Sequence, residues 1–302
     1  MTHAARQMLH SALTPVLLAL LLCMQPTAHA EAPVADLAAQ AWIHGAEDCD
    51  VARTEADHVV WQRVDYRPDT VIFRQSKCTD FEGPFVYLFV GTERALLIDT
   101  GATEEDGPAL YEAVRAVTDL PIVAAHSHGH GDHRMGDPAF AGKPDVALVG
   151  IGAEAVRAFF GFEDWPLQPT SIDLGERILD LVPIPGHTVD DVAFYDRATT
   201  LLITGDSLYP GRLYVRDWPA YKASMARLAT WAAERPVAHV LGTHIEMTAT
   251  PNVDYPMGTT WQPDEAPLPL PPSDLARLAE AAQSMDAPAR IYLDRFIIWP
   301  VD

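Results

Sequence analysis

Short segments in which hydrophobic residues run together or alternate with polar ones, bounded by turn residues, recur along the chain and predict β-strands. Four of them follow one another closely, which favours antiparallel hairpins. They are His58–Val64, Thr70–Arg74, Phe85–Val90 and Ala95–Ile98.

After residue 100 the apolar spacing alternates between helical and strand-like. The segment Pro108–Val117 places Leu110, Val114 and Val117 on one face and predicts a helix. Further helices are predicted at Ala153–Phe160, Pro219–Glu234 and Ser273–Ser284. Strands are predicted at Pro121–Ala125, Arg177–Val182, Val192–Tyr195, Leu201–Thr204, Ala238–Leu241 and Arg290–Trp299.

Prolines are concentrated between residues 251 and 273, where seven of the chain's 25 lie. Proline is disfavoured inside helices and sheets, so this segment is expected to be an extended surface strap. The helix and strand that follow are too short for a core of their own. We therefore expect a single domain over residues 31–302.

The first 30 residues have the pattern of a secretory signal peptide. Arg6 precedes the apolar run Ser11–Cys23, and Ala28-His29-Ala30 forms a cleavage site with the cut after Ala30. The run has 13 residues, fewer than the roughly 20 that span a bilayer, so no retained membrane helix is expected. A periplasmic or secreted location follows.

The chain of 302 residues carries 21 basic and 42 acidic side chains, a formal net charge of −21. Nucleic acid is disfavoured as a partner because its phosphates need a basic surface. With 48% hydrophobic residues the composition is that of a globular protein. The oligomeric state stays open.

Cys49 and Cys78 are the two cysteines beyond residue 30. In an oxidising compartment such a pair forms a disulfide more often than two free thiols.

Four of the nine histidines beyond residue 30 fall in the run His126-Ser-His128-Gly-His130-Gly-Asp132-His133. In an extended segment His128, His130 and Asp132 point to one side, and the intervening glycines let the backbone turn His133 toward the same space. A metal ion would relieve the repulsion between these groups. A solvated polar loop could carry the same residues, but chance would produce this pattern on the order of once in a thousand such chains.

This run resembles the signature of the metallo-β-lactamase-fold hydrolase superfamily, which includes class B β-lactamases, glyoxalase II enzymes and lactonases. Four later or flanking segments resemble the rest of that signature, in the same order: Leu97-Ile-Asp99-Thr-Gly101, Pro185-Gly-His187-Thr188, Thr204-Gly-Asp206-Ser207 and Leu241-Gly-Thr-His244. The resemblance implies an α/β fold, an αββα sandwich of two mixed β-sheets flanked by helices.

The resemblance also implies two divalent metal ions. Zinc is the first choice for nitrogen and oxygen ligands, and iron or manganese would fit as well. The implied ligands are His128, His130 and His187 for one ion, Asp132, His133 and His244 for the other, and Asp206 as the bridge between them.

Two neighbouring residues are expected to support these ligands. Asp99 is expected to orient a ligand histidine or to accept hydrogen bonds from loop backbone. For His126 two roles stay open, contact with a ligand from outside and a structural role on its strand.

A pair of cations lowers the pKa of a bridging water enough to present hydroxide at neutral pH. We expect a hydrolase that cleaves an ester, thioester, lactone or amide of a small molecule, with Asp132 orienting the nucleophile by analogy. A class B β-lactamase is an alternative, although Asp206 stands where the B1 and B2 enzymes place cysteine. The same ligands would also suit an iron-dependent persulfide or oxygen redox enzyme, or a metal-binding protein without turnover.

A basic and aromatic stretch follows the bridging position. Tyr209, Arg212 and Arg216 either line the cleft and bind a substrate carboxylate or phosphate, or the arginines pair with neighbouring acids. The loop Gln75–Pro84, by family resemblance, overlooks the metals. We hypothesise that a Cys49–Cys78 disulfide ties the N-terminal segment to this flap.

Overall fold

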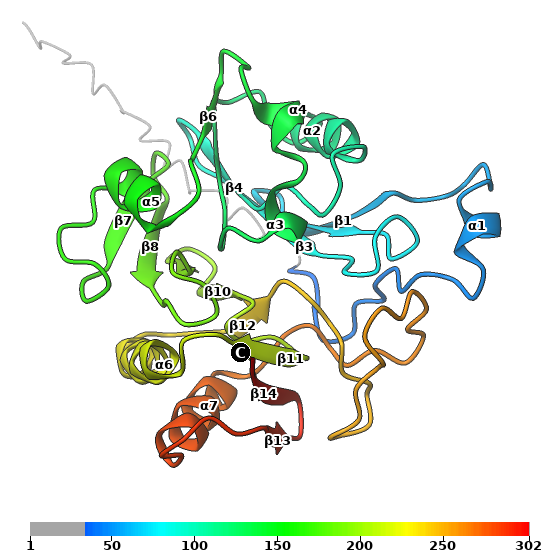
Figure 1. The fold of residues 1–302 in the computed structure, drawn as a ribbon. Coiled ribbons are helices and arrows are strands. Elements are labelled where there is room, and N and C mark those ends of the chain that lie inside the picture. Colours follow the sequence, from blue (N-terminus) through cyan, green and yellow to red (C-terminus); the bar gives the residue numbers. More distant parts are fainter. Residues whose placement is uncertain (1–33, 302) are drawn as a thin grey trace, which may run out of the picture. The chain divides into compact units, whose positions relative to one another are not determined.

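The computed structural model describes residues 34–301, so the predicted signal peptide and its cleavage site lie outside the described residues. Six strands form the first sheet, in which β1 to β4 are antiparallel and β4, β5 and β6 are parallel (Figure 1). These strands are β1 (Trp61–Arg67), β2 (Thr70–Gln75), β3 (Phe85–Val90), β4 (Ala95–Ile98), β5 (Ile122–Ala125) and β6 (Val146–Leu148).

The second sheet has five strands in the order β12, β10, β9, β8, β7. The outer pair β12 and β10 is parallel and the remaining pairs are antiparallel. The strands are β7 (Thr170–Asp173), β8 (Ile178–Pro183), β9 (Val192–Asp196), β10 (Leu201–Gly205) and β12 (His239–Gly242).

Alternating side chains of each strand enter different cores, because successive residues of a strand point to opposite faces. In β3, Phe85, Tyr87 and Phe89 pack between the two sheets, whereas Val86 and Leu88 pack against helices on the outer face. The two sheets therefore stack face to face, and each buries its second face under helices.

Helices α2 and α4 cover the outer face of the first sheet, and α6 and α7 cover that of the second (Figure 1). The predicted αββα sandwich is confirmed. The helices are α1 (Cys49–Ala52), α2 (Gly107–Arg115), α3 (Gly131–Arg134), α4 (Asp137–Phe140), α5 (Ala153–Phe160), α6 (Trp218–Ala233) and α7 (Pro272–Gln283).

The C-terminal strand differs from its prediction. Instead of one strand over residues 290–299, the chain makes a hairpin that joins a third sheet in the order β11, β14, β13. These strands are β11 (Arg212–Val215), β13 (Ile291–Leu293) and β14 (Phe296–Pro300).

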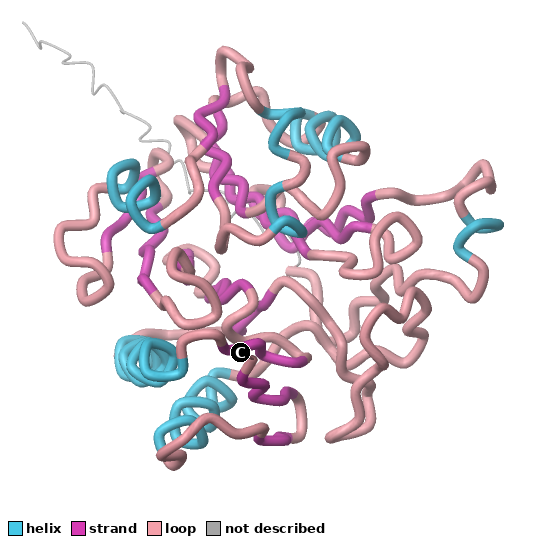
Figure 2. Tube along the Cα trace, in the orientation of Figure 1, coloured by secondary structure: helices cyan, strands magenta, loops and turns pink. Residues whose placement is uncertain are grey.

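The proline-rich strap is also only partly as predicted. Residues 251–271 contain no helix or extended strand, and Figure 2 draws this stretch as loop. A purely surface location is wrong, however, because Leu268 and Leu270 are fully buried and pack into the two main cores. The strap therefore anchors itself in the hydrophobic core through these leucines, while most of its other residues are exposed or half-buried.

Within residues 34–301, no helix is both long and apolar enough to cross a membrane.

Candidate metal centre

The carboxyl ends of strands and the loops beyond them gather the predicted ligands at one edge of the sandwich. Neighbouring parallel strands end side by side, which is why segments far apart in sequence meet there. His128 and His130 follow β5, Asp132 and His133 lie in α3, His187 lies between β8 and β9, Asp206 follows β10 and His244 follows β12.

His128, His130 and His187 form the first group. Nδ1 of His130 lies 3.0 Å from Nε2 of His128 and 3.0 Å from Nε2 of His187, and the two Nε2 atoms are 3.2 Å apart. On the outer side, Nδ1 of His187 donates to the carbonyl oxygen of Tyr214 at 2.6 Å. This contact places the proton of His187 on Nδ1 and leaves the lone pair of Nε2 facing the group.

Asp132, His133, Asp206 and His244 form the second group. Oδ2 of Asp132 lies 3.1 Å from Nε2 of His133 and 3.2 Å from Nε2 of His244. The alternation predicted for the motif ends at residue 131, because α3 begins there. Asp132 therefore faces the second group rather than His128 and His130.

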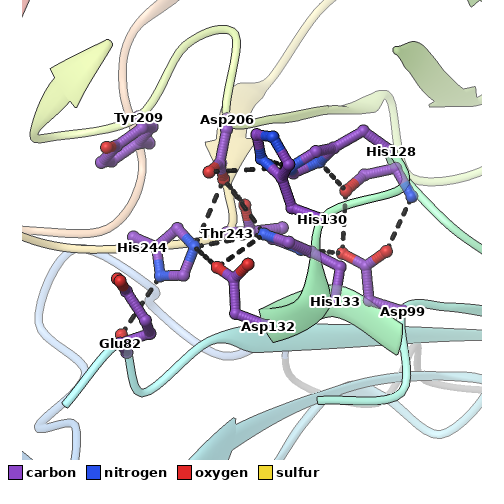
Figure 3. Close-up of polar contacts among 12 residues, drawn as sticks. Glu82, Asp99, His128, His130, Asp132, His133, Asp206, Tyr209, Thr243 and His244 are labelled. Carbon is purple, nitrogen blue, oxygen red and sulfur yellow. Dashed lines mark hydrogen bonds and ion pairs between the residues drawn. The ribbon is translucent and has the colours of Figure 1, made fainter. Parts of the chain in front are cut away.

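Asp206 faces both groups (Figure 3). Its Oδ1 lies 3.3 Å from Nε2 of His244, and its Oδ2 lies 3.6 Å from Nε2 of His187. Asp206 follows Gly205, which has a φ of +54° and approaches Ser127 so closely that a Cβ would lie 2.8 Å from the Ser127 Cβ. Glycine is thus required for the turn that presents the carboxylate.

The second group fits a cation. Nδ1 of His133 contacts Oδ2 of Asp99 at 2.9 Å, and Nδ1 of His244 contacts the carbonyl oxygen of Glu82 at 3.1 Å. Both Nδ1 atoms therefore donate outward, and the two Nε2 atoms, 3.3 Å apart, direct lone pairs at each other. Nitrogen and carboxylate donors that converge in this way are the donor set of a divalent metal.

The two groups differ in electrostatics. Burial lowers the pKa of His130 to about 4 and that of His128 well below its usual value, so the first group is neutral. Burial also acts on His244, but the carboxylates of Asp206 and Asp132 outweigh it and raise its pKa to about 9. The carboxylates of the second group thus favour a positive charge at its centre.

The sequence of the chain matches a known protein family. Residues 79–286 match the model of the metallo-beta-lactamase superfamily, a span of more than half of the chain. The chain belongs to the metallo-beta-lactamase superfamily.

Curated relatives of this superfamily member are hydrolases. A hydroxyacylglutathione hydrolase of Mesorhizobium japonicum is 26% identical over 132 residues, which cover 43% of this chain and 51% of the relative. The human acyl-coenzyme A thioesterase MBLAC2 is 28% identical over 176 residues, covering 45% of this chain and 61% of the relative. The chain thus spans between half and two thirds of the length of these relatives.

Solved metallo-β-lactamase structures share the fold. One from Erythrobacter litoralis has a TM-score of 0.52 at 16% identity, covering 75% of this chain and 97% of that one. Another from Pontibacter korlensis has a TM-score of 0.51 at 20% identity, covering 74% and 100%.

The supporting residues of this superfamily member have distinct contacts. Asp99 accepts hydrogen bonds from the backbone N and the hydroxyl of Ser127 as well as facing His133, so it combines both roles predicted for it. His126 contacts Oδ1 of Asp137 at 2.8 Å rather than a ligand side chain, which favours the structural role.

Sequence patterns did not identify two contacts of this centre. The carbonyl groups of Glu82 and Tyr214 orient His244 and His187. A backbone carbonyl leaves no signature in residue type, so no motif could have indicated them.

Glu82 lies in the predicted flap. A disulfide between Cys49 and Cys78, with a Cα–Cα distance of 4.9 Å, ties the N-terminal segment to this flap, as hypothesised.

Of the predicted substrate contacts, Arg212 and Tyr209 are corrected by the structure. The Arg212 guanidinium is buried and pairs with Glu246 at 2.6 Å and with Asp254 at 2.7 Å. The Tyr209 hydroxyl is buried and bonds to the Arg212 carbonyl and to Glu246. Both side chains hold the fold together and are closed to a substrate anion. Arg216 is exposed and lines a pocket beside the first group.

Proposed function

We propose that this chain is an exported, binuclear metal-dependent hydrolase that cleaves a small-molecule ester, thioester, lactone or amide. The observation that carries the proposal is the position of Asp206, whose two oxygens face different groups of converging donors. A carboxylate so placed suits a bridge between two cations.

Each group of donors would hold one metal ion. One ion would be held by His128, His130 and His187, and the other by Asp132, His133 and His244. Bound ions would polarise the carbonyl to be cleaved and lower the pKa of a water so that it attacks at neutral pH. The Asp132 side chain keeps 23% of its surface exposed, against 0% for His133. This exposure supports a role for Asp132 in which it would orient that water and accept its proton.

A thioester is the first substrate class to test. The relatives are named for hydrolysis of hydroxyacylglutathione and of acyl-coenzyme A. For the metals, donors that are all nitrogen or oxygen favour zinc, with iron or manganese as candidates. The signal-like segment 1–30 and the disulfide support export to the periplasm or beyond.

The test combines metal analysis with a hydrolysis panel. Purified protein is assayed on lactoylglutathione, acyl-homoserine lactones and nitrocefin, with and without a chelator. We expect about two zinc ions per chain and thioester or lactone hydrolysis that the chelator abolishes. The variant Asp206→Asn should lose this activity, and His239→Gln, which changes a histidine outside both groups, should retain it.

Other outcomes identify other functions. Nitrocefin hydrolysis as the dominant activity would indicate a β-lactamase, although position 206 holds an aspartate where the class B1 and B2 enzymes have a cysteine. Iron content without hydrolysis would indicate a redox enzyme. Bound metal with no turnover on any substrate would contradict the proposal.

A further inference from the structure

A pocket of about 540 Å³ opens directly on the first group of ligands. His130 and His187 form part of its wall, so a molecule bound there lies against the centre. The rest of the wall is mainly apolar and comes from α5, the loop after it, the turn around His187 and the start of α6. The apolar lining residues are Ala153, Trp165, Pro166, Pro185, Val189 and Ala220.

The apolar walls are held by the fold. Trp165 packs edge-on against Phe162, with ring centroids 5.1 Å apart, and contacts the main core. Pro185 belongs to a turn that α6 supports, because Gly186 approaches Tyr221 so closely that a Cβ would lie 2.4 Å from its Cα. Val189 at the rim is 69% exposed. A concave apolar surface of this kind is stabilised by an apolar ligand.

One cation lines the same pocket. Arg216 is exposed, and among residues 34–301 its guanidinium makes no hydrogen bond or ion pair. Asp217 beside it is engaged, because its Oδ1 caps α6 by accepting from the backbone N of Ala220 at 3.0 Å. In a chain with a net charge of −21, an arginine left without a partner next to a metal-binding group is suited to an anionic part of the substrate.

We propose that this pocket binds the acyl portion of the substrate, an apolar chain that ends in a carboxylate, and that Arg216 binds this carboxylate. The inference rests on the proposed function, whose substrate class it narrows to ω-carboxyacyl esters or thioesters. Hydrolysis breaks the bond from the acyl carbon to oxygen or sulfur. Water supplies the hydroxyl to the acyl group and a proton to the leaving group, and the product is an α,ω-dicarboxylate.

The product gives a binding test that needs no turnover. Straight-chain dicarboxylates of five to ten carbons and monocarboxylates of equal length are titrated into the zinc-loaded protein by calorimetry. We expect affinity for monocarboxylates to rise about fourfold per methylene until the pocket is filled. At the matching length the dicarboxylate should bind about three- to tenfold more tightly than the monocarboxylate.

Variants separate the two parts of the proposal. Arg216→Gln should abolish the advantage of the dicarboxylate and leave monocarboxylate affinity unchanged. Arg157→Gln, the loss of an exposed charge on α5 outside the pocket lining, is the matched control and should keep the advantage. Ala220→Phe should shorten the longest chain accepted and leave the shortest ligands unaffected.

Affinities independent of chain length, or no binding at all, would overturn the acyl pocket. A dicarboxylate advantage that persists in Arg216→Gln would overturn the role of Arg216. Length-dependent binding without hydrolysis of any ester or thioester would instead reject the proposed function, so the two failures are distinguishable.

Discussion

Oδ2 of Asp99 lies 2.9 Å from Nδ1 of His133, and neither side chain is exposed to solvent. This contact holds the His133 ring with its Nε2 toward the second group. Asp99 adopts a φ of +72°, an uncommon conformation for a residue with a side chain. The turn after β4 thus directs a carboxylate to His133.

Asp99→Asn should weaken metal binding at the second group about 10- to 100-fold. The amide N–H group of asparagine would face groups that themselves donate hydrogen bonds, so one of these bonds would be lost. The first group should keep its affinity. Competition with a chromophoric chelator measures both values. Asp65→Asn, which changes an exposed acid on β1, is the control. Unchanged affinity of the second group would mean that His133 is held without Asp99.

The disulfide should affect the second group through the flap. Cys49 and Cys78 are 29 residues apart in sequence, and their bond restrains the loop that supplies the Glu82 carbonyl to His244. Replacing both cysteines by serine should cost about 2–4 kcal/mol of unfolding free energy. Denaturant unfolding measures this cost. Metal titration should show weaker binding at the second group only, whereas equal weakening of both groups would contradict the link through Glu82.

A buried ion pair fixes the strap to the first sheet. Nη2 of Arg74 lies 2.6 Å from Oε1 of Glu265, and their side chains are 0% and 8% exposed. Glu265→Ala should destabilise the protein by about 3–5 kcal/mol, because it leaves the Arg74 charge buried without a partner. The double variant Arg74→Met with Glu265→Leu should recover most of this loss. A double variant as unstable as the single one in denaturant unfolding would refute this account.

Lys77 should make stability depend on pH. Burial, helped by the Arg74 charge, lowers its pKa to about 8, whereas an unfolded lysine titrates near 10.4. Between these values the unfolded chain binds more protons, so this lysine destabilises the fold below pH 8 and does so less as the pH rises. The Tm of the wild type should therefore rise relative to Lys77→Met from pH 7.5 to 10. Parallel profiles would show that Lys77 keeps its ordinary pKa in the fold.

Local sequence patterns predicted most of the helices and strands. The predicted bounds of β3, β4 and α5 coincide with those observed, and most others agree within a few residues. The predictions missed the four-residue helices α1, α3 and α4. They also missed β6 and β7, whose residues are half-buried or exposed, and β11, which begins at Arg212. Such strands are determined by their partners in the sheet, because their own residues carry little apolar alternation.

The sequence by itself determined most helices and strands and the histidine and aspartate motifs, because apolar periodicity and short spacings depend on residues close together in the chain. Only the tertiary structure decided which groups support the ligands and which are closed to substrate. The carbonyl oxygen of Glu82 contacts His244, which is 162 positions away in the sequence. The Arg212 guanidinium contacts Glu246, which is 34 positions away. Contacts of this kind arise when strands and loops pack, and packing turned one predicted substrate arginine inward while leaving Arg216 at the pocket.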